Sequence, residues 1–300
     1  MNKYYFENIY WRGTDLWPAF AGKKIFVAGG SGFYGKWFVG FLNYLKSEKQ
    51  IPLEIEWGSK STGWLINDFT TFTPFQLHAD YVINCAGYAS ANQPEAEMLS
   101  QHVAGPITMA TGLKKGAVML QISSGIVNDS KENPNAAVLH DYAGAKRAAE
   151  WFLKDMGANV RIVRPFATVG PGMGLDKHFA ISTFIRNKLA NKPLEVSSRQ
   201  ITRSFAHVTD LTVQMFHVLM SESKIPFQVG SDDAITMREA AEYISDNIII
   251  VDTEFPTNAT DEYVANLSRV RNELNLSLDF SSKSAILNTL NHYAADFASV

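Results

Sequence analysis

The sequence contains little cysteine, with Cys85 as the single one in 300 residues. A lone thiol cannot close an internal disulfide, so the sequence supports neither a disulfide-stapled secreted scaffold nor a cysteine metal cluster. The seven histidines are scattered and lack the spacing of metal ligands. We therefore expect a cytoplasmic protein and predict no metal site.

An excess of charge of one sign is also missing. Lys and Arg number 27 against 30 Asp and Glu, which gives a net charge of −3. Such a balance argues against a nucleic-acid or membrane-surface partner. The N-terminus lacks the unbroken apolar run of a signal peptide or membrane span, and we find no internal repeat or low-complexity tract. Hydrophobic residues make up 46% of the chain, which is ample for a large α/β core.

Three glycines stand between a predicted strand and a predicted helix. The run Lys24–Ala28 is typical of a buried strand, and residues 34–45 carry apolar side chains at helical spacing. Gly29, Gly32 and Gly35 lie at and after the junction. Glycine permits a tight turn and lets a pyrophosphate approach the unpaired N–H groups of the helix N-terminus. The pattern indicates a dinucleotide site, although a plain strand-to-helix turn is the simpler alternative.

Tyr142 and Lys146 are one helical turn apart in a segment with helical periodicity. Residues at i and i+4 share a face, so the phenol and the ammonium can address the same point. A free phenol has a pKa of about 10, and a neighbouring ammonium lowers that pKa by favouring the phenolate. The pair suits removal of a proton from a hydroxyl while hydride leaves the carbon, although an exposed helix can carry the same spacing by chance.

A hydroxyl follows a predicted central strand. The apolar run Ala117–Ile122 ends in Ser123 and Ser124. Ligands of parallel sheets bind beyond the carboxyl ends of the strands. We expect Ser124 to share a substrate oxygen with Tyr142, unless the serines only cap the next turn.

Taken in order, these motifs resemble the extended short-chain dehydrogenase/reductase family, in its NAD-dependent nucleotide-sugar epimerase/dehydratase branch. The resemblance runs from about residue 23 to 293, and its later motifs are Arg164-Pro165-Phe166, Gly170-Pro171-Gly172, Arg203–Leu211 and Ser268–Leu274. It implies an α/β fold with a Rossmann-type doubly wound parallel sheet and a smaller mixed α/β substrate-binding lobe. NAD is the implied cofactor and a nucleotide sugar the implied partner.

The resemblance also implies a role for individual residues. Ser124, Tyr142 and Lys146 match the catalytic trio, and Ser124 and Arg203 would bind substrate, Arg203 through the diphosphate. The implied cofactor contacts are Gly29, Gly32, Phe33, Tyr34, Gly35, Asp68, Ala86, Gly87, Tyr142, Lys146 and Pro165. Glu56 stands in for the aspartate that holds the ribose hydroxyls of NAD, whereas Ser59 and Lys60 would suit the 2′-phosphate of NADP. We favour NAD.

One departure from the family pattern bears on the reaction. Gly125 and Ile126 follow Ser124, where relatives that eliminate water or carbon dioxide usually carry acidic residues. Elimination across C5 and C6 needs an acid and a base, so a 4,6-dehydratase is weakened most. A UDP-glucuronate decarboxylase is weakened less, because a β-keto acid loses carbon dioxide readily.

We therefore predict an enzyme that transiently oxidises the sugar of a nucleotide sugar at C4. A UDP-sugar 4-epimerase is the first choice, and a UDP-glucuronate decarboxylase is the alternative. An NADPH-dependent nucleotide-sugar reductase or a 4,6-dehydratase comes next. A non-catalytic dinucleotide-binding regulator is the last alternative, because a binding module has no need of a proton relay.

The periodicity predicts helices over residues 94–113, 140–156, 179–190, 210–221, 236–246 and 284–297. Thr236 and Glu239 are spaced as a Thr-x-x-Glu capping box that opens the helix over 236–246. We expect an aromatic N-terminal extension at 1–22, a dinucleotide-binding domain at 23–164, and a mainly substrate-binding, interwoven lobe at 165–300. The helices over 94–113 and 140–156 resemble the family's dimer-forming pair, with Gly144, Ala148 and Trp151 as candidate contacts. We expect a homodimer, unless these helices only cover the sheet of their own subunit.

Overall fold

The computed structural model describes residues 3–59, 77–87, 94–129, 142–176, 179–252 and 261–298. The chain divides into two compact units. The sheet unit contains the residues up to Pro165 together with Thr212–Phe227. The lobe unit contains Phe166–Leu211 and the residues from Gln228 onward. Residues 212–227 thus return to the sheet unit, so residues 165–300 do not form one continuous lobe.

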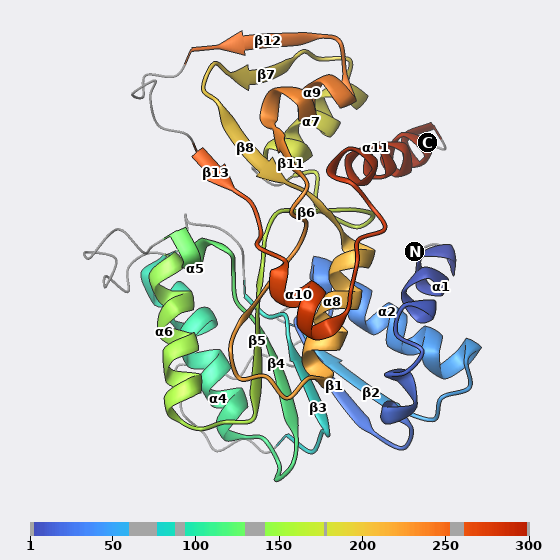
Figure 1. The fold of residues 1–300 in the computed structure, drawn as a ribbon, viewed down its shortest axis with the longest axis vertical. Helices are drawn as coiled ribbons and strands as arrows, with labels where there is room; N and C mark the ends of the chain where they lie inside the picture. Colours follow the sequence, from blue (N-terminus) through green and yellow to red (C-terminus); the bar gives the residue numbers. More distant parts are fainter. Residues whose placement is uncertain are drawn as a thin grey trace. The chain divides into compact units, whose positions relative to one another are not determined.

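A six-stranded sheet forms the centre of the sheet unit, in the order β10-β5-β4-β3-β1-β2 (Figure 1). Its strands are β1 (Lys24–Ala28), β2 (Glu54–Gly58), β3 (Tyr81–Asn84), β4 (Val118–Ile122), β5 (Val160–Pro165) and β10 (Phe227–Val229). The pairs from β2 through β5 are parallel, so their carboxyl ends form one edge. The strand order reverses between β1 and β3, where ligands of such sheets bind. The predicted α/β fold with a Rossmann-type parallel sheet is confirmed.

Aromatic helices cover one face of the sheet. They are α1 (Lys3–Trp11), the 3-10 turn η1 (Trp17–Phe20), α2 (Phe33–Glu48) and, from Thr212 on, α8 (Val208–Met220). Phe6 packs against Trp37 with ring centroids 5.8 Å apart, and Trp17 packs edge to face on Phe216 at 5.3 Å. The aromatic N-terminal segment therefore packs onto its own unit.

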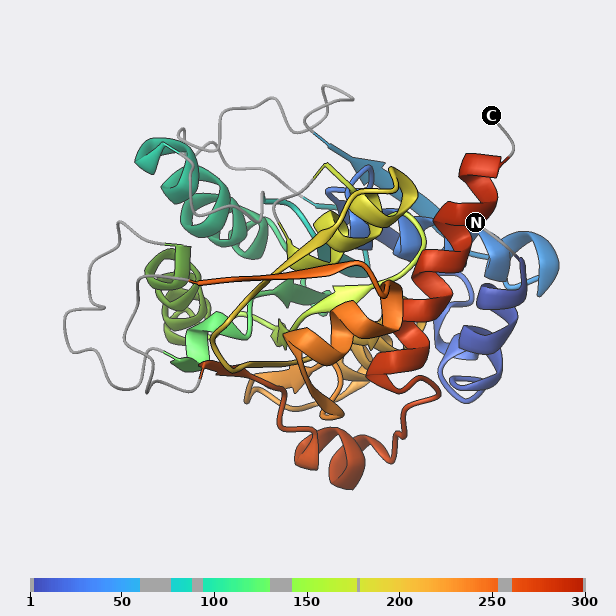
Figure 2. The same ribbon diagram turned by 90° about the horizontal axis from the view of Figure 1, so that it is seen from above.

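The other face is covered by α4 (Gly105–Thr111) and α6 (Tyr142–Asp155), which lie side by side in Figures 1 and 2. Met109 of α4 and Leu153 of α6 join Phe26, Val82 and Met119 of the strands in one buried apolar cluster. The apolar residues that predict the strands therefore form the core between sheet and helices.

The helix predicted over 94–113 contains a wider turn. It consists of α3 (Glu95–Leu99), the π-helical turn η3 (Ser100–Ala104) and α4. Pro106 has no N–H to donate to the carbonyl of His102 four residues earlier, and its ring would clash with that carbonyl in a regular α-helix. The π-turn relieves this conflict and sets the direction of His102.

The lobe unit combines small sheets with helices. Its strands are β6 (Thr168–Val169), β7 (Leu194–Ser197), β8 (Ile201–Ser204), β9 (Ala206–His207), β11 (Ala234–Thr236), β12 (Ile248–Val251) and β13 (Asp261–Tyr263). They pair as β11-β8-β13, β12-β7 and β6-β9. The helices are α7 (Ala180–Leu189), α9 (Met237–Ile244), α10 (Ser268–Leu274) and α11 (Ser282–Ala298). The predicted capping box is present, because Thr236 Oγ accepts the Glu239 N–H at 3.1 Å and the Glu239 carboxylate accepts the Thr236 N–H at 2.7 Å.

Candidate active site

The glycine turn has a shape that only glycine allows. Gly29 has a φ of 78°, and a Cβ there would lie 2.8 Å from the Ala86 nitrogen. A Cβ at Gly35 would collide with the carbonyl oxygen of Gly29. Gly32 is the N-cap of α2 and offers no side-chain acceptor to the first-turn amides. The turn thus forms a backbone cradle at a helix N-terminus, which fits the pyrophosphate of a dinucleotide.

Phe33 and Tyr34 open α2 directly after this cradle. Both are half-buried, and their ring centroids lie 5.3 Å apart. The backbone N–H of Lys36 donates to the Gly32 carbonyl at 2.9 Å, which begins the helical hydrogen-bond pattern. The predicted cofactor contacts of Phe33 and Tyr34 stay predictions.

Glu56 has a cation as its partner, and its predicted contact with the cofactor ribose stays a prediction. Glu56 lies on β2 opposite Phe26, and its carboxylate forms an ion pair with Lys24 at 2.5 Å. Lys24 is the first residue of β1, at the edge opposite to the one where ligands bind. Glu56 is therefore engaged away from the expected position of the cofactor ribose. Asp68 lies outside the described residues.

Gly87 and His102 fit together beyond the end of β3. Gly87 has a φ of 121°, and a Cβ there would lie 2.5 Å from Cε1 of His102. The His102 ring is buried and meets the Tyr142 ring edge to face at 5.0 Å. Gly87, predicted to lie under the cofactor, thus lies against a ring that packs on Tyr142, the predicted base. The sequence analysis missed His102, although Pro106 signals the π-turn that directs it.

Tyr142 and Lys146 form the expected pair on α6. Lys146 Nζ lies 5.6 Å from the centroid of the Tyr142 ring and donates to the Ile122 carbonyl at 3.0 Å. Burial lowers the pKa of Lys146 to about 8, while the charges of Glu150 and Cys85 act in the opposite direction. Near neutral pH the side chain is an ammonium held at the carboxyl end of β4, where it stabilises a nearby phenolate.

The two serines after β4 have different surroundings. Ser123 is buried and donates to the carboxylate of Glu150. Ser124 is half-buried, and its Oγ accepts the Ile126 N–H at 3.4 Å, so it also caps α5 (Ile126–Asp129) weakly. Of the two, Ser124 is therefore the better placed to meet a substrate.

A part-buried ion pair supports this edge of the sheet. Arg164 of β5 donates to Glu150 through Nε at 3.0 Å and through NH2 at 2.5 Å. Glu150 is one turn after Lys146 on α6 and raises the pKa of that amine. Pro165, a predicted cofactor contact, ends β5, and its carbonyl accepts the Gly125 N–H at 2.9 Å. Sequence reasoning missed Glu150, which its i+4 spacing from Lys146 could have indicated.

Arg203, predicted to grip the diphosphate, belongs to the lobe unit. Its NH1 forms an ion pair with Asp261 Oδ1 at 2.9 Å and also donates to the carbonyls of Thr202 and Asp261. Its guanidinium lies 5.9 Å from the Tyr263 ring centroid. A diphosphate would therefore compete with Asp261 for this cation, and the contact stays a prediction.

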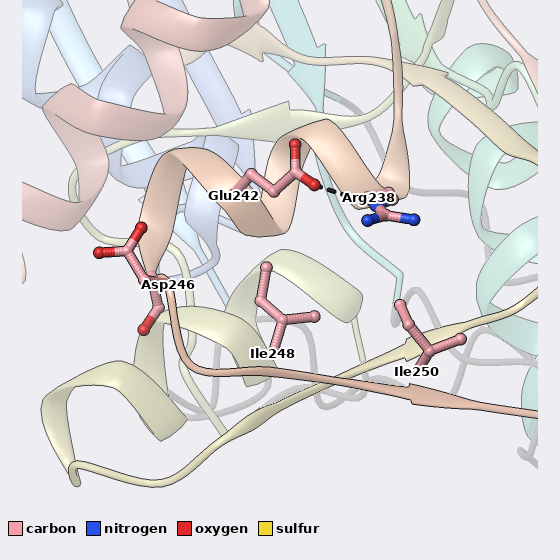
Figure 3. A pocket seen from close by; sticks show the side chains of 6 residues that line it. Arg238, Glu242, Asp246, Ile248 and Ile250 are labelled. Atoms are coloured by element: carbon pink, nitrogen blue, oxygen red, sulfur yellow. Dashed lines mark hydrogen bonds and ion pairs between the residues drawn. The ribbon is translucent and has the colours of Figure 1, made fainter.

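A hollow of about 320 Å³ lies elsewhere in the lobe unit, between α9 and β12 (Figure 3). It is lined by Arg238, Glu242, Ser245, Asp246, Ile248 and Ile250. Arg238 and Glu242 are one turn apart on α9 and form an ion pair with each other at 2.9 Å. None of the predicted site residues lines this hollow.

The described part of the chain contains no group of three or more His, Cys, Asp or Glu side chains that could hold a metal ion. Among the same residues, no helix combines the length and the apolar character needed to cross a bilayer.

The sequence model of the NAD dependent epimerase/dehydratase family matches residues 25–230. The chain belongs to this family. Membership confirms the resemblance noted in the sequence, the enzyme class at family level and NAD as the cofactor type. The glycine cradle and the Tyr142–Lys146 pair both lie within the matched residues.

Curated relatives include two UDP-glucuronic acid decarboxylases of Arabidopsis thaliana. Number 2 is 28% identical over 274 residues, which cover 80% of this chain and 61% of the relative. Number 1 is 28% identical over 300 residues, covering 87% of this chain and 68% of the relative. The chain thus spans about three fifths of the length of the first relative.

Solved structures with the same fold carry several activities. A dTDP-glucose 4,6-dehydratase from Streptomyces venezuelae with NAD bound has a TM-score of 0.72 at 17% identity, over 92% of this chain and 98% of that one. A UDP-N-acetylglucosamine 4-epimerase from Methanobrevibacter ruminantium has a TM-score of 0.71 at 18% identity, over 91% of this chain and 99% of that one. At these identities the likeness establishes the fold alone.

Proposed function

We propose that this chain is a nucleotide-sugar enzyme that oxidises its sugar transiently at C4. The observation that carries the proposal is the Lys146 ammonium 5.6 Å from the Tyr142 ring, at the carboxyl end of a central parallel strand. A phenol beside a buried ammonium is a base for an alcohol and has no evident use in a protein that only binds a dinucleotide. The non-catalytic regulator is disfavoured for this reason.

Each residue has a defined task in this proposal. When bound, NAD would accept the hydride from C4 and later return it. Tyr142 removes the proton of the C4 hydroxyl, and Lys146 keeps the phenol acidic and holds the nicotinamide ribose. Ser124 donates a hydrogen bond to the C4 oxygen as it becomes a carbonyl. The cradle of Gly29, Gly32 and Gly35 holds the pyrophosphate.

Two outcomes follow C4 oxidation. In a decarboxylase, the C5–C6 bond of the 4-keto uronic acid breaks, carbon dioxide leaves, and the electron pair becomes an enolate that is protonated at C5. In a 4-epimerase, the hydride returns to the opposite face of C4. Epimerisation needs no acidic residue after Ser124, where Gly125 and Ile126 stand, and loss of carbon dioxide from a β-keto acid depends on one less than elimination of water does. The curated relatives favour UDP-glucuronate decarboxylation over the epimerisation that the sequence analysis ranked first.

The test is incubation of NAD-loaded protein with UDP-, dTDP- and GDP-sugars, including UDP-glucuronate, followed by mass spectrometry. We expect one sugar to change without net consumption of NAD, with loss of carbon dioxide for a decarboxylase and unchanged mass for an epimerase. Tyr142→Phe should slow turnover by at least about 100-fold. Tyr4→Phe is the matched control, because Tyr4 is 67% exposed, and it should leave the turnover rate unchanged. Turnover that requires a continuous supply of NADPH would support the reductase instead.

We also propose a homodimer formed through α6. Trp151 and Phe152 of α6 are 59% and 40% exposed, and Met156, directly after the helix, is 41% exposed, which makes an apolar stretch at the end of α6. Gly144 is buried within its own unit and Ala148 is half-buried, so Trp151 is the main contact of the three that the sequence suggested. Trp151→Glu should halve the mass measured by light scattering, and an unchanged mass would contradict the proposal.

The expected cytoplasmic location stays a prediction.

A further inference from the structure

Two buried amide side chains face each other across β3 and β4 at the carboxyl ends of these strands. Asn84 and Gln121 are each 1% exposed and are direct partners in the parallel register. A buried amide costs free energy unless its hydrogen bonds are satisfied, and an apolar pair of similar shape would be about as stable. Stability alone therefore does not account for an amide pair here.

The two amides belong to a continuous series of hydrogen bonds. The Ala86 N–H donates to Asn84 Oδ1 at 3.0 Å, and Asn84 Nδ2 donates to Gln121 Oε1 at 2.7 Å. Gln121 Nε2 then donates to the Ile122 carbonyl at 2.9 Å, and Lys146 Nζ donates to the same oxygen at 3.0 Å. We call this series, from Ala86 to Lys146, the amide relay.

The direction of the relay is fixed by its first member. A backbone N–H can only donate, so the atom of Asn84 that faces Ala86 is Oδ1. Asn84 Nδ2 therefore faces Gln121 and requires Oε1 as its acceptor. Only Nε2 of Gln121 is then left for the Ile122 carbonyl. Neither amide can turn over without placing two donors or two acceptors against each other.

The ends of the relay lie at two different parts of the cofactor site. At one end, the Ala86 nitrogen lies so close to Gly29 that a Cβ on that glycine would be 2.8 Å away. At the other end, the Ile122 carbonyl uses one of the three N–H bonds of the Lys146 ammonium and so sets the direction of the other two. The glycine cradle would contact the pyrophosphate in the middle of the dinucleotide, and the ammonium would contact the nicotinamide ribose attached to it.

We propose that Asn84 and Gln121 are positioning residues that hold the Lys146 ammonium in register with the glycine cradle. This inference rests on the proposed role of Lys146 in holding the nicotinamide ribose. A cation that is already directed at its acceptor loses less freedom when the cofactor binds, so Asn84 and Gln121 strengthen binding without touching NAD themselves. An interruption between Asn84 and Ile122 removes that preorganisation and leaves every cofactor-contacting residue in place.

The test is a double-mutant cycle on NAD affinity, measured by tryptophan fluorescence on nucleotide-free protein. Gln121→Met keeps the length of the side chain and removes its hydrogen bonds. It should weaken NAD binding by about fivefold to tenfold. In a Lys146→Met background the same substitution should change the affinity by less than about twofold, because the group that the relay directs is gone.

Asn159→Ala is the matched control. Asn159 Nδ2 donates to the Ala117 carbonyl at 2.9 Å, which is the same kind of bond at the opposite end of β4. This variant should lower the melting temperature and leave NAD affinity within about twofold of wild type. A Gln121→Met protein with wild-type affinity would overturn the proposal. So would an equal loss of affinity in the presence and the absence of Lys146.

A second variant separates positioning from folding. Asn84→Leu combined with Gln121→Met replaces the amide pair by an apolar pair, so neither buried amide is left without a partner. We expect it to melt no lower than Gln121→Met alone and to bind NAD just as weakly. Wild-type affinity in this double variant would overturn the proposal.

The binding cycle needs no sugar, so it separates the two proposals. Wild-type protein that binds NAD and converts no nucleotide sugar would contradict the proposed function, while the cycle would still test the relay. Wild-type protein that binds no NAD would overturn the relay proposal as well.

Discussion

The rings of His102 and Tyr142 meet edge to face, with centroids 5.0 Å apart and planes at 89°. His102 comes from the π-turn before Pro106, and its ring lies against Gly87 on another side. The position of the phenol therefore depends on a buried ring that a regular α-helix would direct elsewhere. π-turns of this kind are frequent at functional sites.

Replacing His102 tests this dependence. His102→Ala leaves a void beside Tyr142, so we expect kcat to fall by about tenfold with a smaller change in KM. His102→Phe keeps an edge-to-face ring and should recover most of the rate. Steady-state kinetics on the substrate found in the sugar panel measures both. His217→Ala, which removes a half-buried ring from α8, is the control for lost stability. Equal rates for the Ala and Phe variants of His102 would show that ring packing is not the cause.

Gly87 should tolerate no side chain. Gly87→Ala places a Cβ 2.5 Å from the His102 ring at a φ of 121°, so it should displace that ring and weaken both NAD binding and turnover. Gly116→Ala is the matched variant, because Gly116 has a φ of 83° and nothing within 4 Å of its Cβ position. Both variants lose about 1 kcal/mol or more to backbone strain. Only Gly87→Ala should lower NAD affinity, and equal affinities would contradict the fit of Gly87 against His102.

NAD binding should weaken as the pH rises through about 8. Burial lowers the pKa of Lys146 to about 8, so the folded protein loses this proton well before an unfolded chain does. Between about 8 and the ordinary lysine value the unfolded chain binds more protons, so the contribution of Lys146 to stability rises with pH in that window. Titration of NAD affinity between about pH 6 and pH 10 measures the binding effect. Glu150, Cys85, Tyr142 and His102 are the other titratable groups nearby. Lys146→Met should abolish the fall of NAD affinity at alkaline pH. If the fall persists in this variant, one of the other four groups causes it.

Glu150→Gln should lower the stability of the protein and shift the pH at which NAD affinity falls. The substitution leaves the part-buried Arg164 without the charge of Glu150, which should cost about 1–3 kcal/mol because Glu150 is buried while Arg164 is 24% exposed. It also removes the charge that raises the pKa of Lys146, so NAD binding should weaken at a lower pH than in wild type. Chemical denaturation and the pH titration measure the two effects. Glu273→Gln, in an exposed i,i+4 pair with Arg269, should change stability by less than about 1 kcal/mol. Equal losses in the two variants would contradict the buried role of Glu150.

The elements that sequence predicts well are set by neighbours along the chain. Apolar runs fix β1 and β4, the i+4 spacing brings Lys146 to Tyr142, and the capping box of Thr236 and Glu239 appears as expected. The glycine turn is predictable because its chemistry is that of the backbone. These features need no knowledge of what packs against them.

The remaining features depend on residues far apart in sequence. Asn84 and Gln121 become partners only when β3 and β4 pair, and Arg203 meets Asp261 only because β13 pairs with β8. The place of Glu56 on β2 suggests a cofactor contact, but its carboxylate also pairs with Lys24 at the start of β1, which only the strand register brings close. Local patterns therefore predict the Tyr142–Lys146 pair and the glycine turn, whereas the partners that orient them follow from strand order.

The most direct test of the account uses nucleotide sugars that carry deuterium at C4. NAD-loaded protein is incubated with C4-deuterated UDP-glucuronate and with C4-deuterated UDP-glucose, and the products are analysed by NMR and mass spectrometry. If C4 is oxidised and reduced again, one of the two sugars is converted, more slowly than its unlabelled form, with the deuterium back at C4 of the product. Conversion of neither sugar, or a product formed at the unlabelled rate, would contradict oxidation at C4.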